Sequence, residues 1–191
     1  MKLFGKSNCI EIYDNALSEK ECDILINYFE NSPKFEGLST YNGVACANDA
    51  VKKCQELHEC SFENNNKISH IIQPNLVRCI TRYSEKYESL NFISAWKYDN
   101  NYTFQRYETE DDGFKEWHCE HGLGHLNRIL AWMFYINDAK CGTEFMYHPN
   151  VNAKKGRCVI WPAGWEYLHR SVVPNKGLKY VISGWINYMQ E

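Results

Sequence analysis

The stretch LHRSVVPNKGLKYVISGW, residues 168–185, decides how the chain must fold. It holds a histidine, a proline–glycine turn and a lysine in a run otherwise suited to a buried strand. Because side chains alternate along a strand, one face carries Lys179, Val181, Ser183 and Trp185. Exposing that face would put a valine and a tryptophan in water, whereas burying it obliges the lysine to meet a negative charge. We therefore expect Lys179 to point into a pocket that receives an anion.

Similar short runs, rich in aromatic and β-branched residues, fill the second half of the chain. They are FISAWKY (92–98), YTFQRY (102–107), RILAWMFYI (128–136), GRCVIW (156–161) and KYVISGWINY (179–188). Turn signals such as DDG, NDAKCG, NAKKG and PNKG separate them. Several short strands at close spacing predict an antiparallel sandwich or barrel of the jelly-roll kind.

The first half of the chain has helical patterns instead. SEKE, residues 18–21, has capping-box spacing, and apolar residues follow it at helical intervals. A second helix is expected from about Asn48 to Glu59, and a third from Pro74, a favoured first-turn residue. We expect one domain over residues 1–191, mainly β (α+β), in which a helical front of about 1–91 buttresses a β core of about 92–191.

Composition narrows the class of protein. The chain has 191 residues, 44% of them hydrophobic, and its net charge of -3 gives no support for nucleic-acid binding. No apolar run approaches membrane-spanning length, and the N-terminus lacks a secretory signal pattern. We expect a cytoplasmic protein with neither nucleic-acid nor membrane partners.

Nine cysteines are present, an odd count without a C-x-x-C pair. A disulfide framework therefore fits badly, and we expect most of these cysteines to be small, buried and reduced. The competing interpretation is a zinc site built from Cys46, Cys54, Cys60 and His58. Their spacings match no standard zinc module.

The densest group of histidines lies in EWHCEHGLGH, residues 116–125. A helix here would align His118, His121 and His125, but two glycines argue against it and the H-E-x-x-H pattern is absent. If the segment is instead the end of a strand, His118 and Glu120 project from one face, and the other two histidines belong to the following loop. His169, about fifty residues later, adds a second imidazole. Two histidines and one carboxylate form the facial set that holds Fe(II) and leaves positions open.

In this ordered combination the chain resembles the iron(II)- and 2-oxoglutarate-dependent dioxygenases of the prolyl 4-hydroxylase type. The likeness covers roughly residues 92–188 and is strongest in FQRYETEDDGFKEWHCE, RILAWMFYINDAKCGTEF, KKGRCVIWP and HRSVVPNKGLKYVISGW. It implies a double-stranded β-helix (jelly-roll, cupin-like) core. It also implies Fe(II), 2-oxoglutarate and O2 as cofactors and cosubstrates, with ascorbate as a further candidate.

The resemblance assigns roles to individual residues. His118, Glu120 and His169 match the metal ligands of the family. Lys179 matches the basic residue that pairs with the distal carboxylate of 2-oxoglutarate, and Tyr107 matches a tyrosine that helps to hold this cosubstrate. No side chain beyond the metal centre is implied as a catalytic acid, base or nucleophile.

Two residues depart from the family pattern. Glu120 stands where aspartate is more common, so its longer carboxylate must fold back to reach a metal. Ser171 stands where related sequences often have glycine, and we expect it to affect only the local backbone. Three tryptophans are candidates for the walls of the site: Trp161, Trp165 and Trp185.

The function that the resemblance implies is hydroxylation of an unactivated C–H bond with release of succinate and CO2. A peptidyl proline is the first candidate substrate; a small metabolite or another residue type is the alternative. A non-enzymatic metal-binding β-barrel is a different class of function, and Lys179 disfavours it, because a structural metal has no use for a nearby cation. A halogenase on this fold would lack the carboxylate ligand. The acidic segment 107–115 is either a lid or a solvated turn.

Overall fold

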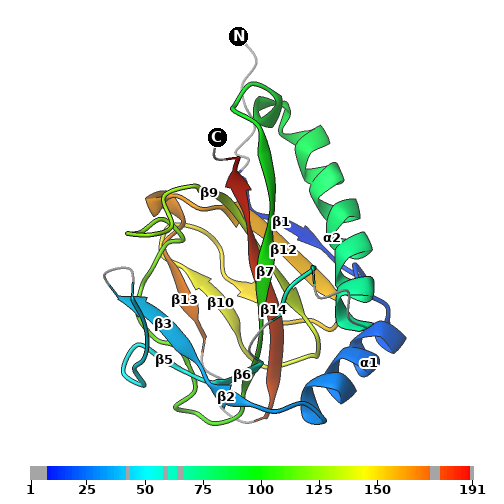
Figure 1. Ribbon diagram of the computed structural model, residues 1–191, viewed down its shortest axis with the longest axis vertical. Helices are drawn as coiled ribbons and strands as arrows, with labels where there is room; N and C mark the ends of the chain where they lie inside the picture. The colour runs from blue at the N-terminus through cyan, green and yellow to red at the C-terminus, as the bar shows by residue number, and fades with distance from the viewer. Residues whose placement is uncertain (1–7, 42–43, 58–59, 64–66, 173–176, 190–191) are drawn as a thin grey trace.

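The computed structural model describes residues 8–41, 44–57, 60–63, 67–172 and 177–189. Its centre is a seven-stranded sheet of order β1-β12-β9-β14-β7-β6-β2, in which every neighbouring pair is antiparallel. These strands are β1 (Glu11–Tyr13), β2 (Phe35–Glu36), β6 (Gln55–Leu57), β7 (Trp96–Tyr107), β9 (Arg128–Tyr135), β12 (Arg157–Pro162) and β14 (Lys179–Tyr188). Figure 1 shows the long strands β7 and β14 running together through the middle of the molecule.

Smaller sheets complete the β structure. A three-stranded sheet has the order β11 (Val151–Asn152), β10 (Gly142–Phe145), β13 (His169–Ser171). Two further pairs are β3 (Leu38–Tyr41) with β4 (Val44–Ala47), and β5 (Lys52–Lys53) with β8 (Gly113–Phe114). The predominance of antiparallel strands agrees with the mainly β class predicted from the turn spacing.

Alternation along the central strands divides the interior into two cores. From β14, the residues that join the core under the helices are Tyr180, Ile182 and Ile186. The alternate residues of the same strand face the space between the two sheets, and they include Lys179, Val181 and Trp185. Neighbouring β9 divides its side chains in the same way, with Trp132 and Phe134 in the first core and Tyr135 in the second.

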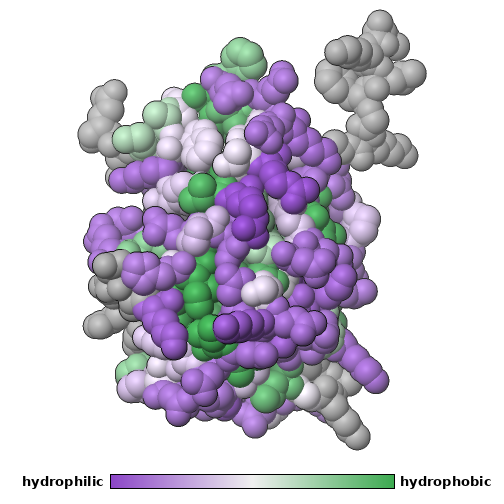
Figure 2. Space-filling model, turned by 90° about the vertical axis from the view of Figure 1, so that its right-hand side faces the viewer, coloured by the Kyte–Doolittle hydropathy of each residue, from purple (hydrophilic) through white to green (hydrophobic). Residues whose placement is uncertain are grey.

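Two helices cover the outer face of the large sheet, on the right of Figure 1. Helix α1 (Glu19–Glu30) begins at Ser18 with the predicted capping box, and α2 (Lys67–Lys86) packs beside it. Two short 3-10 turns occur at Glu88–Asn91 and Trp165–Tyr167. No helix in the described part of the chain is long and apolar enough to cross a membrane. Figure 2 shows this helical side, which is mostly hydrophilic with a narrow apolar strip.

The second predicted helix, from about Asn48 to Glu59, is wrong. The structure has strands β5 and β6 in this segment, and residues 58 and 59 lie outside the described residues. From residue 52 to residue 56 burial follows a period of two, with Lys52, Cys54 and Glu56 buried, and Leu57 after them is buried as well. The lysine and the glutamate form an ion pair, so charges that normally mark a solvated helix face are internal here. The front of the chain is therefore only partly helical.

The third predicted helix exists but begins seven residues earlier than expected. Pro74 lies inside α2 rather than in its first turn. The buried stripe extends on both sides of it, through Ile68, Ile72, Leu76 and Ile80. Proline carries no backbone donor and weakens a helix interior, but Pro74 is on the exposed face, where it does not disturb the stripe.

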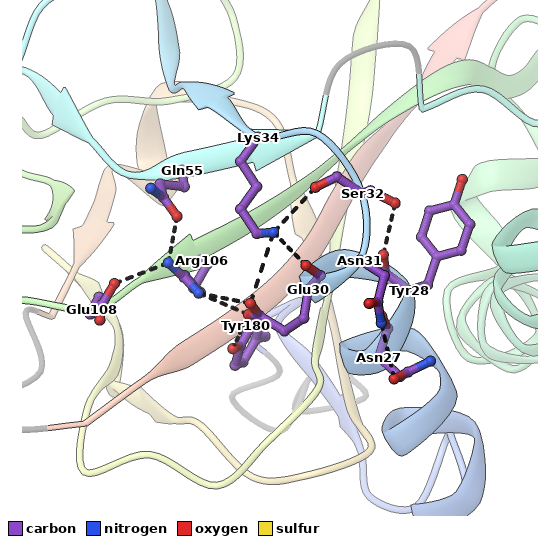
Figure 3. Close-up of polar contacts among 10 residues, drawn as sticks. All are labelled: Asn27, Tyr28, Glu30, Asn31, Ser32, Lys34, Gln55, Arg106, Glu108 and Tyr180. Carbon is purple, nitrogen blue, oxygen red and sulfur yellow. Dashed lines mark hydrogen bonds and ion pairs between the residues drawn. The ribbon is translucent and has the colours of Figure 1, made fainter.

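A polar network fixes the end of α1 against the sheet (Figure 3). The Arg106 guanidinium donates to both carboxylate oxygens of Glu30, at 2.9 and 3.0 Å. Tyr180 also donates to Glu30, and Arg106 reaches Gln55 on β6. Arg106 and Tyr180 are paired in register across β7 and β14, one residue from the pair Tyr107 and Lys179. The outer network therefore supports the register that sends Lys179 inward.

Glycine is required at position 184, in the middle of β14. A β-carbon there would lie 2.4 Å from the Trp132 side chain, which is fully buried. Gly184→Ala should therefore lower the free energy of unfolding by about 1–3 kcal/mol, the usual cost of overpacking. Urea denaturation tests this. Gly122→Ala is the control, because an added β-carbon there meets nothing within 4 Å, and equal stability of the two variants would contradict the packing.

Candidate metal and cosubstrate site

A cavity of about 490 Å³ lies among the inward side chains of the central strands, β13 and the segment after His118. This is a usual size for a small-molecule site. Its walls combine apolar groups with histidines and with buried charges. Trp161 and Trp185 line it as expected, but Trp165 does not, since it is 67% exposed on a 3-10 turn.

Three predicted ligand residues meet at this cavity. His118, Glu120 and His169 each offer an atom that lies within 4.8 Å of the others, and the described residues contain no second such cluster. Their convergence does not come from a regular strand carrying His118 and Glu120. His118 makes a single backbone bridge to His169, and the Glu120 amide donates to the Ala163 carbonyl at 3.1 Å.

Backbone carbonyls fix the two imidazoles. Nδ1 of His118 lies 3.0 Å from the Glu116 carbonyl, and Nδ1 of His169 lies 2.9 Å from the Tyr167 carbonyl. A carbonyl only accepts, so each Nδ1 carries a proton and Nε2 is the ring nitrogen that faces the cluster. Nε2 of His169 is 3.3 Å from Oε1 of Glu120. Carbonyls that accept from Nδ1 in this way hold metal-binding histidines in one tautomer.

The protonation states at neutral pH suit a cation. Burial, followed by the nearby His169, lowers the pKa of His118 to about 3. Burial raises the pKa of Glu120, but the hydrogen bond and charges around the carboxylate outweigh it and lower the value to about 2. His118 is therefore neutral and Glu120 is ionised.

Lys179 points into the same cavity, as the strand alternation predicts. It is only 3% exposed, and burial lowers its pKa to about 8. Its ammonium donates to the Ser171 hydroxyl and lies 3.4 Å from the Val172 carbonyl. Ser171 therefore does more than shape the backbone, which corrects our expectation. Sequence spacing gave no signal for this contact, because the two residues come from different strands.

Tyr107 lies directly beside Lys179. The lysine nitrogen is 4.5 Å from the centre of the tyrosine ring, and the two residues are paired across β7 and β14. The Tyr107 hydroxyl donates to Gln105 at 2.8 Å. A cation over an aromatic face is stabilised by the ring quadrupole, so Tyr107 helps to hold the buried ammonium in place.

A buried ion pair forms another part of the wall. Lys52 donates to Glu56 at 2.9 Å, and both line the cavity with side chains less than one tenth exposed. The pair also holds both backbone groups of Leu38: its amide donates to Glu56 and its carbonyl accepts from Lys52. Strand β3 is thereby attached at the cavity edge. Neither charged residue was predicted to line the cavity, because the pattern of segment 48–59 suggested a helix.

The remaining candidates lie around this group. His121 and His125 line the cavity in the loop after Glu120, as predicted, and do not join the ligand cluster. The acidic segment 107–115 is organised by Asp112, whose carboxylate accepts from the Glu108 and Thr109 amides as in a compact turn. Six of the nine free cysteines are buried, in agreement with the prediction. The described cysteines form no metal cluster, and His58 lies outside the described residues.

The sequence of this part of the chain matches a known family. Residues 102–187 fit the model of the 2OG-Fe(II) oxygenase superfamily, and this range holds all three clustered ligands and Lys179. The match covers less than half of the chain, and over these residues the chain is similar to that superfamily. The predicted resemblance is confirmed.

Individual oxygenases extend the comparison. Prolyl 4-hydroxylase subunit alpha-1 of Gallus gallus is 30% identical over 115 residues, covering 54% of this chain and 21% of that protein. The chain thus spans about a fifth of the length of its curated relatives.

Solved oxygenase structures share the fold. The viral collagen prolyl hydroxylase of Paramecium Bursaria Chlorella virus-1, in its 2OG complex, has a TM-score of 0.65 at 16% identity over 95% of this chain and 97% of its own. A Trichoplax adhaerens prolyl hydroxylase bound to a hypoxia inducible factor peptide has a TM-score of 0.71 at 13% identity, over 95% of this chain and 84% of its own. The predicted double-stranded β-helix is confirmed.

The Lys52–Glu56 ion pair at the cavity wall should be important for stability. Glu56→Gln removes the counter-charge of a buried lysine, and breaking such pairs costs roughly 3–5 kcal/mol. Because glutamine keeps some of the hydrogen bonds, we expect the free energy of unfolding to fall by about 3 kcal/mol, the lower end of this range. Urea denaturation measures the loss. Lys53→Met, which breaks the exposed pair with Asp111, is the control and should leave the midpoint unchanged. Similar midpoints for both variants would mean that the pair is not strongly coupled to folding.

Proposed function

We propose that the protein is an Fe(II)- and 2-oxoglutarate-dependent dioxygenase that hydroxylates a peptidyl proline. His118, Glu120 and His169 hold the iron, and Lys179 receives the distal carboxylate of 2-oxoglutarate. The family of residues 102–187 and the cluster of two histidines and a carboxylate support this proposal. The names of the relatives support the choice of proline.

The residues present fit the metal. Fe(II) favours two imidazoles and one carboxylate with open positions for other ligands. Both histidines have Nδ1 engaged by a carbonyl, which leaves Nε2 free, and Glu120 carries a negative charge. His118 and Glu120 are therefore in the protonation states that a divalent cation requires at neutral pH.

One observation carries the choice of an oxygenase over a passive metal barrel. Of the cations that line the cavity, Lys52, Arg128 and Arg170 each have a carboxylate partner. Lys179 has none within the described part of the chain, although it is almost fully buried. A buried ammonium without an acid is costly unless a ligand supplies the charge. A dicarboxylate that binds the metal with one end supplies it with the other.

The protein's own contribution is placement. When bound, Fe(II) and 2-oxoglutarate activate O2 for hydroxylation of an unactivated C–H bond, with release of succinate and CO2. Lys179, supported by Ser171 and Tyr107, fixes the far end of the cosubstrate. Val181 and Trp161 give the cavity apolar walls that keep water away from the reacting atoms. No side chain needs to act as a general base.

The proposed reaction predicts that succinate formation and peptide hydroxylation both depend on His169. Proline-containing peptides should stimulate Fe(II)-dependent succinate formation and gain the mass of one oxygen, as measured by mass spectrometry. His169→Ala should abolish both signals, because it removes a proposed ligand. His125→Ala should retain Fe(II) binding, since this residue lines the cavity outside the cluster. Turnover of a small metabolite with no effect of any proline peptide would contradict the substrate, and an active His169→Ala would contradict the iron site.

The role of Lys179 predicts both an affinity and a pH dependence. Lys179→Met deletes a charge-assisted contact worth about 1.5–3 kcal/mol, so 2-oxoglutarate affinity should fall by roughly one to two orders of magnitude. With a pKa of about 8 before binding, the lysine is charged at pH 7 and becomes neutral above pH 8. The dissociation constant should therefore rise between pH 8 and 9, by up to about tenfold per pH unit.

Anaerobic titration of the Fe(II)-loaded protein, followed by the visible charge-transfer absorption, measures these constants. Lys179→Arg is the matched control, because a guanidinium stays charged over this range and should remove the pH dependence. Unchanged cosubstrate affinity in Lys179→Met would show that another group receives the distal carboxylate.

A further inference from the structure

The two oxygens of Glu120 face different partners. Oε1 lies 3.3 Å from Nε2 of His169, at the centre of the ligand cluster. Oε2 accepts a hydrogen bond from the indole nitrogen of Trp185 at 2.6 Å and lies 3.4 Å from Nη1 of Arg128. One oxygen is therefore directed at the cluster while the other is engaged by the wall of the cavity.

The Trp185 indole, which donates to Oε2, is itself held in place. The Arg128 guanidinium carbon lies 3.5 Å from the centre of the Trp185 ring, a stacked cation–π contact. Both side chains of the Arg128–Glu120 ion pair are nearly buried, at 12% and 11% exposed. Trp185 comes from β14 and Arg128 from the start of β9, and the two strands are neighbours in the central sheet. The indole N–H therefore points at the carboxylate from a rigid support.

We propose that Trp185, stacked under Arg128, is a positioning residue that allows a glutamate to serve as the carboxylate ligand. Glutamate has one more rotatable bond than aspartate, so ordering it costs more conformational entropy. Fixing Oε2 on the indole removes that freedom before any metal arrives and leaves Oε1 free for the ion. The inference rests on the proposed iron site and adds to it the reason why the longer acid is tolerated.

An aspartate at position 120 would not make this contact in the same way. Its carboxylate lies one methylene closer to the backbone, so without a backbone shift its two oxygens would not reach both the Trp185 indole and the present position of Oε1. The benefit of the indole N–H should therefore depend on the length of the acid. This dependence separates a specific positioning role from general packing of a tryptophan, which would act equally on either acid.

Metal affinity, measured without turnover, tests the proposal. Co(II) is titrated anaerobically in the absence of cosubstrate, and its visible ligand-field absorption reports both the dissociation constant and the coordination geometry. Trp185→Phe keeps the ring and the stacking surface but deletes the N–H. We expect it to weaken Co(II) binding by roughly tenfold, within the range usual for partners behind a metal ligand. We also expect a changed ligand-field spectrum.

Trp165→Phe is the control, because it makes the same change of ring and deletes an indole N–H away from the ligand cluster. Trp165 is 67% exposed on a 3-10 turn and does not line the cavity. Its replacement should leave the Co(II) affinity within about twofold of the wild type. Thermal unfolding of both variants checks that the fold is kept.

The double variant decides the mechanism. In the Glu120→Asp background, Trp185→Phe should change Co(II) affinity by less than about twofold, because the contact that it removes is already lost. A tenfold effect in both backgrounds, or equal affinity of wild type and Trp185→Phe, would overturn the positioning role and leave the iron site intact. Failure of the wild type to bind Co(II) at all would instead overturn the proposed function.

Discussion

The alternation of side chains along β14 is the constraint on which the rest of the molecule depends. Antiparallel pairing with β7 on one side and β9 on the other fixes which residues face inward. Lys179 and Trp185 then enter the cavity at opposite ends of one strand face. A slip of one residue would send both outward and bring Tyr180 inward. The outer contacts of Arg106 and Tyr180 with Glu30 oppose such a slip.

Two buried lysines in the same cavity illustrate different solutions to one energetic problem. Lys52 has an internal counter-ion in Glu56, so its charge is satisfied by the fold itself. Lys179 has only neutral oxygen acceptors and an aromatic ring, and burial lowers its pKa. The first arrangement stabilises the structure and attaches β3, whereas the second leaves a charge that a ligand must complete. This difference is why we assign Lys52 to the cavity wall and propose Lys179 as the binding residue.

The sequence revealed those parts of the site where chemistry and strand period coincide. The inward direction of Lys179 was predictable because a charge interrupts an otherwise buried strand. The grouping of His118, Glu120 and His169 was predictable because these residue types form a known ligand set. The contacts of Ser171 were not predictable, since they depend on how two strands meet. The helix predicted for residues 48–59 was wrong for a related reason. In sequence, Lys52 and Glu56 look like the charges of a solvated helix face, and only the structure shows that they form an internal ion pair.

The balance of charges in the cavity connects these observations. The positive charge of Arg128 offsets the negative charge of Glu120 through a contact with Oε2, the oxygen that faces away from the cluster. The carboxylate is thereby stabilised as an anion, and Oε1 still faces the cluster. A divalent cation beside Glu120 and a dianion reaching Lys179 together add no net charge to the cavity. Either one alone would leave an unbalanced charge in a low-dielectric space, where such an imbalance is costly. In the proposed reaction, metal and cosubstrate are therefore complementary ligands of a single site, with Glu120 at one end of the charge arrangement and Lys179 at the other.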